Sequence, residues 1–477
     1  ASGYMSAEND AHIQPIDAAP LAGRSFGKTL TVFDLTLFTV SAIVLLDTLA
    51  ATASIGPSAV TWWLLLAVFF ALPMGLITAE MGTTYPEQGG LYAWIRNAFG
   101  AKWAARAAWG YFINNALWVP SVYVMFSGFL VRLFGLDLPL SAQVGINIAL
   151  LWVTVAVNCA SLELGKWVPN LGALLKMIIF LTIIVGGFAY AGVHGFANEF
   201  PREAMTPTWS DSLKYLPAII YGMLGFELVS ASGEEIKNAE RDLPASILLS
   251  GVIVIGLYTL STAAVLAVLP AGDINLVEGL VDMLQMLFGD SMAGKAAVIV
   301  FGVAALYTFF SNGVTWSIGC NRASAAAADE GQLPRFFGWK DKRHGAPIGS
   351  AIAMGAIGTA VLILYGSAAS SNEDLFWGLF AFSAVIFLAP YAALALAFFR
   401  MRLIDPKRRR PFRVPGGVVG AFLLTALCVS ALSGAIFLFL YVPGEGVQQM
   451  TLIGLLVAIA VGEILIALAR AGKKRRA

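Results

Sequence analysis

An apolar run at residues 213–235 contains the sequence Tyr221-Gly222-Met223-Leu224-Gly225-Phe226-Glu227. A run of this length can cross a bilayer as a helix, which takes about 20 apolar residues. Glycine pairs allow a helix to unwind, and a carboxylate inside a membrane is costly enough to mark a functional group. The stretch therefore predicts a membrane helix that is broken beside Glu227, with close helix packing at the two glycines as the alternative.

Eleven more apolar runs of spanning length accompany this one. The chain has 477 residues, of which 58% are apolar and 12% are charged, whereas a soluble domain has about 25% charged residues. The sequence therefore predicts an all-α membrane protein with twelve transmembrane helices. The runs lie at about 30–54, 59–82, 103–134, 142–162, 167–192, 213–235, 244–269, 294–328, 348–369, 374–403, 418–442 and 447–470.

Lysine and arginine gather on alternate connections between these runs, for example in the cluster Lys407-Arg408-Arg409-Arg410. Because such connections remain in the cytoplasm, we expect a multi-pass protein of the cell (inner) membrane with both termini cytoplasmic. The expected parts are a cytoplasmic tail at 1–29, a core at 30–403, and two further helices with a basic tail at 404–477. The amphipathic connections at 193–212 and 270–293 should form short surface helices.

The remaining composition argues against other classes of protein. A net charge of +1 gives no reason to expect a nucleic-acid partner. Three cysteines lie far apart in apolar runs, and all three histidines fall outside such runs, so we expect neither a cofactor nor a metal site. The sequence contains no nucleophile motif, which argues against an enzyme, and no repeated filter loop, which argues against a channel.

Few ionisable residues lie inside the predicted spans, and each is a candidate functional group. Asp47 interrupts the first run in the sequence Ser41-Ala42-Ile43-Val44-Leu45-Leu46-Asp47-Thr48. Lys176 lies in the fifth run and Glu227 in the sixth. Glu80 lies at the inner end of the second run, where its carboxylate can reach the interface.

Four motifs resemble those of the amino acid–polyamine–organocation (APC) transporter superfamily, in the same order and over nearly the whole chain. One follows the second run, one the sixth and one the eighth, and the last precedes the eleventh. They are Pro86-Glu87-Gln88-Gly89-Gly90-Leu91-Tyr92-Ala93-Trp94, Glu234-Glu235-Ile236-Lys237-Asn238-Ala239-Glu240-Arg241-Asp242-Leu243-Pro244, residues 325–334 with Gly345-Ala346-Pro347, and Arg410-Pro411-Phe412-Arg413-Val414-Pro415-Gly416.

The resemblance implies a fold and a mechanism. Members of the superfamily have a leucine-transporter-like fold of two inverted repeats of five helices, which here correspond to residues 30–192 and 213–403, followed by two extra helices. Helices 1 and 6 are discontinuous and hold the substrate. The resemblance thus implies a secondary transporter that works by alternating access, as a proton symporter or an exchanger.

The resemblance also implies site residues. In the arginine/agmatine antiporter pattern, Asn115 corresponds to a substrate-contacting Asn, Trp316 to a Trp that stacks on the substrate, and Tyr221 to an aromatic gate. Glu227 corresponds to an acid proposed as a proton sensor. Lys176 resembles a helix-5 Lys whose ammonium lies where sodium-coupled relatives bind Na⁺, which implies sodium-independent transport.

One departure from the family pattern bears on the cargo. The family's helix-1 G-S-G break binds the substrate carboxylate, but here Leu46-Asp47-Thr48 stands in its place. An ionised Asp47 repels a carboxylate and attracts an ammonium, so we favour a monoamine or polyamine as the cargo. An ordinary neutral or cationic amino acid is the alternative, and a protonated Asp47 that only packs in the core is a third possibility.

The expected substrate site therefore lies between the two broken helices, and the expected partners are a small amine or amino acid, protons and the lipid bilayer. Its coupling residues are Lys176 and Glu227. Its substrate-binding residues are Val44, Leu45, Leu46, Asp47, Asn115, Trp118, Tyr221, Gly222, Gly225, Phe226, Glu227 and Trp316.

Overall fold

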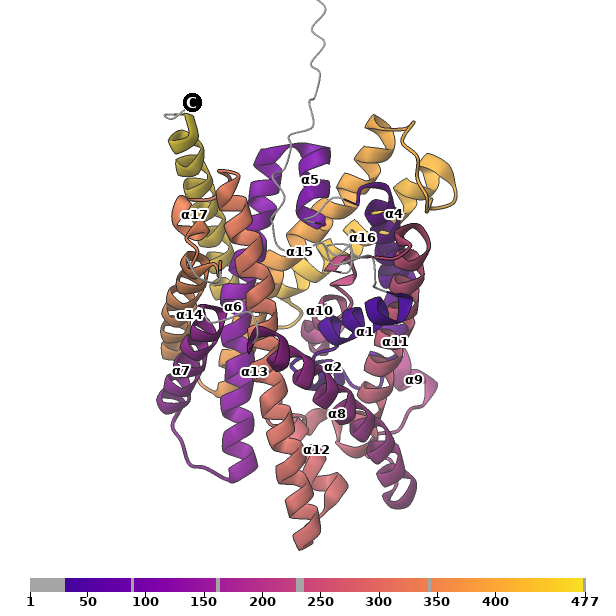
Figure 1. Ribbon diagram of the computed structural model, residues 1–477. Helices are drawn as coiled ribbons and strands as arrows, with labels where there is room; N and C mark the ends of the chain where they lie inside the picture. Colours follow the sequence, from indigo (N-terminus) through magenta and orange to yellow (C-terminus); the bar gives the residue numbers. More distant parts are fainter. Residues whose placement is uncertain (1–30, 87–89, 160–163, 229–235, 342–344, 475–477) are drawn as a thin grey trace, which may run out of the picture.

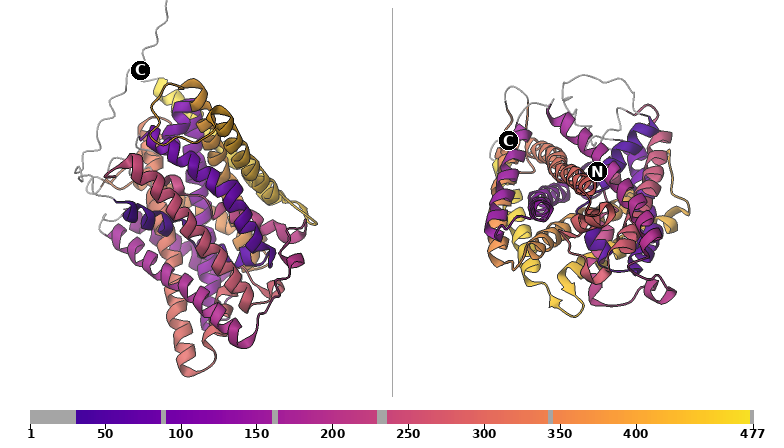
Figure 2. Two further views of the ribbon diagram at one scale, coloured as in Figure 1. Left: turned by 90° about the vertical axis from the view of Figure 1, so that its right-hand side faces the viewer. Right: turned by 90° about the horizontal axis from the view of Figure 1, so that it is seen from below.

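The computed structural model describes residues 31–86, 90–159, 164–228, 236–341 and 345–474, and these residues are almost entirely helical. Most of the long helices run from one end of the molecule to the other (Figures 1 and 2). The predicted tail at 1–29, the end of the basic C-terminus, and part of two family motifs (87–89 and 234–235) lie outside the described residues.

Ten helices in the described part of the chain are long and apolar enough to cross a membrane, so the chain is a multi-pass membrane protein. Each coincides with one of the predicted runs. They are the continuous segment α3 (Ser58–Leu66), η1 (Ala67–Ala71) and α4 (Leu72–Thr84), then α6 (Ala101–Phe134), α7 (Leu140–Cys159), α8 (Leu164–His194), α11 (Ala239–Val268), α13 (Met292–Asp329), α14 (Ile348–Ala368), α15 (Asn372–Ile404), α16 (Gly417–Leu440) and α17 (Gln449–Lys474).

The first and sixth predicted runs are interrupted, as the sequence indicated. In the first, α1 (Val32–Ile43) ends before the non-helical residues 44–48, and α2 (Leu49–Ala53) follows. In the sixth, α10 (Leu216–Tyr221) has only six residues and stops at Gly222. Both runs therefore contain short helices that end near the middle of the molecule (Figure 1).

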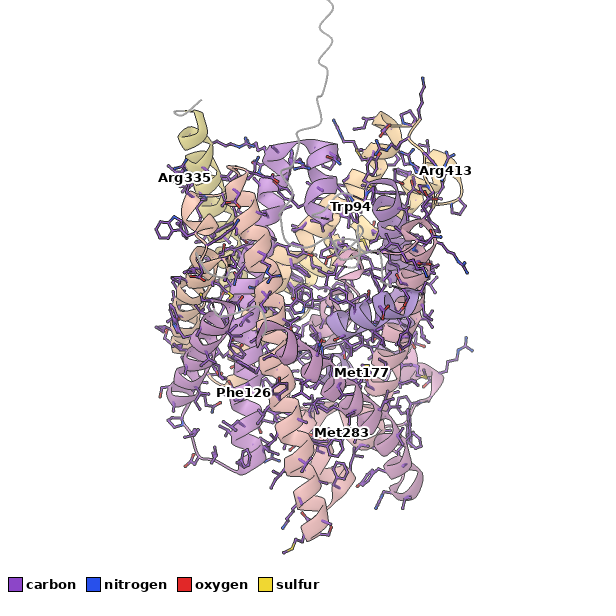
Figure 3. All side chains as sticks on the ribbon, viewed as in Figure 1. Trp94, Phe126, Met177, Met283, Arg335 and Arg413 are labelled. Atoms are coloured by element: carbon purple, nitrogen blue, oxygen red, sulfur yellow. The ribbon has the colours of Figure 1, made fainter. Side chains whose placement is uncertain are left out.

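Short elements cover the two ends of the helix bundle. The end that carries α12 lies opposite the end that carries α5 (Figure 1), and the labelled Arg335 and Arg413 lie at the α5 end (Figure 3). The short helices expected within 193–212 and 270–293 are present. These elements are α5 (Leu91–Phe99), α9 (Arg202–Met205), η2 (Asp211–Tyr215), η4 (Ala271–Asp273), α12 (Gly279–Phe288), η5 (Arg335–Gly338) and the antiparallel pair β1 (Tyr441–Val442) and β2 (Gly446–Val447).

Helix α15 lies at the centre of the bundle and α17 at its periphery. Within their most apolar windows, 78% of the α15 residues but only 11% of the α17 residues are buried. Helix α17 is joined to α6 by an ion pair between Arg106 Nε and Glu463 Oε1 at 2.5 Å, and by the Trp109 indole N–H, which donates to the Ala458 carbonyl at 2.9 Å. The central site is therefore built without α17.

The Glu80 carboxylate does not reach the interface, which corrects the sequence-based expectation. Its residue is only 2% exposed, and the carboxylate accepts hydrogen bonds from Arg402 at 2.5 and 2.6 Å and from the Val414 N–H at 2.7 Å. The Arg410 guanidinium lies 3.1 Å from it. Because one carboxylate satisfies two arginines here, the group links α4, α15 and the connection before α16.

Candidate functional site

The break in the first membrane segment is stabilised by side chains from two neighbouring helices. The Tyr258 hydroxyl of α11 accepts a hydrogen bond from the Leu45 N–H at 2.8 Å and donates to the Ile43 carbonyl at 3.0 Å. The Lys176 ammonium of α8 donates to the Ser41 carbonyl at 2.7 Å. A cation is favourable there because the carbonyl end of a helix carries partial negative charge.

Asp47 lies within this break and is 1% exposed. The Trp118 indole N–H of α6 donates to Asp47 Oδ2 at 3.0 Å, whereas Oδ1 forms no hydrogen bond with any described residue. The backbone N–H groups of Asp47 and Thr48 lie close to the same carboxylate, and Lys176 interacts with it electrostatically. Buried acceptors are nearly always paired, so an unpaired Oδ1 next to Trp118, which lines the cavity described below, is a candidate contact for a ligand.

The break in the second segment depends on its two glycines. Gly225 has a φ of +113°, a conformation that residues with a Cβ rarely adopt, and a Cβ there would lie 3.0 Å from Ile43 Cγ1. A Cβ on Gly222 would lie 3.3 Å from Trp63 Cη2. The sequence left two roles open for these glycines, helix unwinding and close helix packing. The structure shows both, because the helix ends at Gly222 and Gly225 lies close to Ile43 of the first broken segment.

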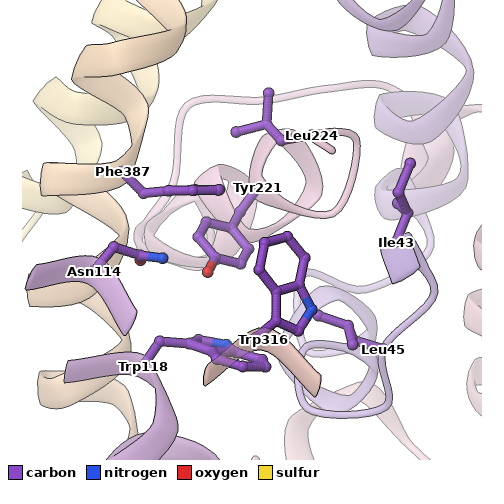
Figure 4. A pocket seen from close by; sticks show the side chains of 8 residues that line it. All are labelled: Ile43, Leu45, Asn114, Trp118, Tyr221, Leu224, Trp316 and Phe387. Carbon is purple, nitrogen blue, oxygen red and sulfur yellow. The ribbon is translucent and has the colours of Figure 1, made fainter. Parts of the chain in front are cut away.

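A cavity lies between the two breaks (Figure 4). The Trp118 and Trp316 rings meet edge to face with centroids 6.0 Å apart, and Phe387 lies 6.3 Å from Trp316 and 5.4 Å from Tyr221. Aromatic faces of this kind attract cations. Figure 4 also shows the Tyr221 hydroxyl directed toward the Asn114 amide. The lining residues are Ile43, Leu45, Asn114, Trp118, Tyr221, Leu224, Trp316 and Phe387.

Glu227 does not line this cavity but lies in an adjacent polar layer. It is 4% exposed, and its Oε1 accepts hydrogen bonds from Tyr111 of α6 at 2.5 Å and Tyr391 of α15 at 2.6 Å. Phe387 packs on both tyrosine rings, with centroids 5.2 and 5.0 Å away. Glu227 therefore accepts hydrogen bonds from two neutral hydroxyl groups. Phe387, which packs on both tyrosines, also lines the cavity.

The structure brings together most, but not all, of the predicted site residues. Leu45, Trp118, Tyr221 and Trp316 line the cavity, and Val44, Leu46, Asp47, Gly222 and Gly225 form the two breaks. By contrast, the Asn115 amide donates to Met354 Sδ in α14 at 3.1 Å, and Phe226 packs beside Gly251 of α11.

Several residues around the cavity were missed by the sequence reasoning. Asn114 lines the cavity in place of its neighbour Asn115, and its four-residue spacing from Trp118 would have placed both on one helix face. Tyr111, Tyr391, Phe387 and Tyr258 stand in apolar runs, where nothing separates them from packing residues. No group of three or more potential metal ligands occurs among the described residues.

Comparison with known proteins agrees with this geometry. A sequence profile of amino acid permeases matches residues 30–462. The chain belongs to the amino acid permease family. The resemblance to APC transporters is therefore confirmed, and this permease is a membrane transporter by family. Its relatives are transporters rather than enzymes.

Three curated relatives show the range of the family. The permease is 31% identical to a probable agmatine/putrescine antiporter of Lactococcus lactis, over 92% of this chain and 95% of the relative. It is 24% identical to a glutamate/gamma-aminobutyrate antiporter of the same species, over 84% and 81%. It is 23% identical to a probable polyamine transporter of Arabidopsis thaliana, over 74% and 68%.

Proposed function

We propose that this permease is a secondary active transporter of small amines that lack a carboxylate, and that it works by alternating access. The observation that carries the proposal is the buried Asp47 carboxylate: its Oδ1 has no hydrogen-bond partner among the described residues, and its Oδ2 accepts from Trp118 of the cavity lining. An ammonium supplies both the charge and the donors that this oxygen lacks. The names of the agmatine/putrescine and polyamine relatives support the same class of cargo.

The helix break is poorly suited to a ligand carboxylate. The Val44 N–H donates to the Val40 carbonyl at 2.9 Å, and the Leu45 N–H donates to Tyr258. The N–H groups of Asp47 and Thr48 lie close to the Asp47 carboxylate, so this side chain takes the place that a ligand carboxylate would need. Two like charges 4 Å apart also repel by about 4 kcal/mol at an effective dielectric constant of 20.

A neutral or cationic amino acid is the second candidate cargo. It is favoured by the glutamate/gamma-aminobutyrate antiporter and by a serine/threonine exchanger of Bacillus subtilis, which is 31% identical over 57% of this chain. The ammonium of such a cargo would bind Asp47 in the same way. The two candidates therefore differ only in whether the site tolerates a carboxylate, which makes a direct comparison possible.

Coupling is proposed to be sodium-independent and to use protons or exchange. The Lys176 ammonium contacts the carbonyl end of α1 and already supplies a positive charge there. Glu227, held by Tyr111 and Tyr391, can take up a proton without losing a cationic partner among the described residues. A proton on Glu227 would reduce the negative charge near the cavity and so weaken the binding of a cationic cargo at Asp47.

The proposed architecture has twelve spans in a five-plus-five inverted repeat, with repeats at 30–192 and 213–403 and two further helices within 404–477. The ten continuous helices plus the two interrupted segments support this number. Each interruption falls in the first segment of its proposed repeat. We also propose that both termini lie in the cytoplasm of a cell whose inner membrane holds the protein.

The test is uptake of a labelled diamine into proteoliposomes by the Asp47→Asn variant. Loss of the charge-assisted contact should weaken apparent amine affinity about 10- to 100-fold. Asp34→Asn is the matched control, because Asp34 is the exposed third residue of the α1 capping box, where the Asn amide oxygen can still accept from the Thr31 N–H. Amine transport that survives Asp47→Asn unchanged would exclude the proposed site.

A further inference from the structure

One face of α6 carries Tyr111, Asn114 and Trp118. Residues three and four apart lie on the same face of a helix, and these three span about 10 Å of the helix axis. At one end of the face, the Trp118 indole N–H donates to Asp47 at 3.0 Å. At the other end, the Tyr111 hydroxyl donates to Glu227 at 2.5 Å. The face therefore runs from one buried acid to the other, with Asn114 between them.

Asn114 lines the cavity, and its amide points into it. Figure 4 shows the amide directed toward the Tyr221 hydroxyl, across the cavity from Leu45 of the first break. The residue is only 2% exposed, and its Oδ1 has no hydrogen-bond partner among the described residues. A side-chain amide presents an acceptor on one side and donors on the other, and a half-turn exchanges them. Asn114 and Tyr221 can therefore offer two neutral oxygen acceptors to a ligand here.

The surroundings of Asn114 favour a positive charge. Phe387 and Trp316 also line the cavity, and aromatic faces attract cations. Phe387 packs on Tyr111, whose hydroxyl binds Glu227, so an ionised Glu227 adds negative charge just beyond the cavity wall. None of the described residues that line the cavity is a lysine or an arginine. A cationic group near Asn114 would thus meet oxygen acceptors and ring faces without an opposing charge in the lining.

We propose that the cargo is an elongated dication, such as a diamine, and that Asn114 binds its second charged end. The inference rests on the proposed amine function, in which Asp47 binds the first ammonium. A second ammonium placed along the α6 face from Asp47 would meet the Asn114 amide oxygen, with the Tyr221 hydroxyl beside it. Asn114 is therefore a specificity-determining residue that separates diamines from monoamines.

The test uses two ligands that differ by one ammonium group. Putrescine and butylamine share their carbon chain and one ammonium, so the ratio of their dissociation constants isolates the effect of the second ammonium. Binding is measured by thermal stabilisation of the full chain in detergent. The wild-type chain should prefer putrescine. In Asn114→Ala this preference should fall about tenfold, because putrescine loses a hydrogen bond to a charged group that butylamine never makes.

Asn115→Ala is the matched control, since it removes the same amide from the next residue of α6. The Asn115 amide donates to Met354 Sδ of α14 at 3.1 Å, and Asn115 does not line the cavity. This variant should leave the ratio unchanged. If Asn114→Ala does not yield folded protein, Asn114→Leu decides the matter, because it keeps a similar volume but offers no acceptor. A general loss of packing would weaken both ligands alike.

The outcomes separate the two proposals. Equal binding of putrescine and butylamine by the wild-type chain overturns the role of Asn114 alone. A preference that persists in folded Asn114→Ala, or in Asn114→Leu if that variant must be used, does the same, as does a ratio that changes in Asn115→Ala instead. If the wild-type chain binds neither amine, or if Asp47→Asn binds both as tightly as wild type, the proposed amine function fails and the role of Asn114 fails with it.

Discussion

At the residue scale, the site depends on a few residues that each contribute one specific feature. Asp47 contributes one unpaired oxygen, and Trp118 fixes the other one by its indole N–H. Gly225 contributes a backbone conformation instead of a side chain. These roles arise from single atoms, so conservative substitutions should separate charge, hydrogen bonding and backbone shape.

Gly225→Ala should be strongly destabilising, because a Cβ at a φ of +113° is strained and would lie 3.0 Å from Ile43 Cγ1. Strain of this kind costs about 1–3 kcal/mol. We expect a lower melting temperature and reduced amine uptake. Gly256→Ala is the control, since this glycine lies within α11 and a Cβ there meets no atom within 4 Å. A Gly225→Ala protein as stable and active as wild type would contradict the need for this glycine.

The sequence predicted the interruptions at this scale but not all of the side chains around them. Glycine and acidic residues destabilise a helix inside a membrane, so their presence in apolar runs predicted the breaks at Asp47 and Gly225. Aromatic residues such as Tyr111 and Phe387 are ordinary components of a membrane helix, so the sequence does not single them out. They come together near Glu227 only because α6 packs against α15. Asn114 and Asn115 are chemically identical, so helix rotation alone decided between them.

At the element scale, the ends of helices are tied by a few buried ion contacts. Glu80 near the end of α4 binds Arg402 of α15 and Arg410 of the connection that follows it. Arg410 is therefore not a free surface charge, and the basic cluster seen in the sequence presents its other three members to the surroundings. This separation of one buried arginine from three exposed basic residues could not be deduced from a run of like charges.

Glu80→Gln should destabilise the protein by about 3–5 kcal/mol, because it leaves two buried guanidinium groups without a counter-charge. Glu240→Gln is the matched control, since Glu240 pairs with Arg409 at 3.1 Å on the surface, where ion pairs contribute less than about 1 kcal/mol. Thermal denaturation in detergent measures both. If the two variants melt at the same temperature, the Glu80 group does not hold α4 to α15.

At the scale of the whole molecule, the chain is a helix bundle with chemically different ends. One end carries α5, Arg335 and Arg413, and the other carries α12 (Figures 1 and 3). The positions of the ten long helices in the described part of the chain could be predicted from sequence, because each needs its own apolar run. Which helices pack against one another could not be predicted, because lipid-facing and buried positions have similar apolar compositions.

The proposed orientation is tested by single cysteines placed at the two ends. Arg409→Cys in the connection between α15 and α16 and Lys295→Cys near the start of α13 are both exposed positions. In spheroplasts, a membrane-impermeant maleimide should label Lys295→Cys but label Arg409→Cys only after lysis. The background is low because Cys320 and Cys428 are buried, and a Cys159→Ala background removes the remaining half-buried thiol. Labelling of both positions from one side would contradict the proposed topology.

Under the proposed function, the side chain of Phe387 would couple the cavity to Glu227. Phe387 contacts Trp316 and Tyr221 on one side and the two tyrosines that hold Glu227 on the other. A cargo molecule that displaced this ring would also disturb the Tyr111 and Tyr391 hydroxyl groups that bind Glu227. By reciprocity, a change at Glu227 would alter the binding free energy of the cargo by the same amount. Cargo and proton would then influence each other across α15 without ever meeting.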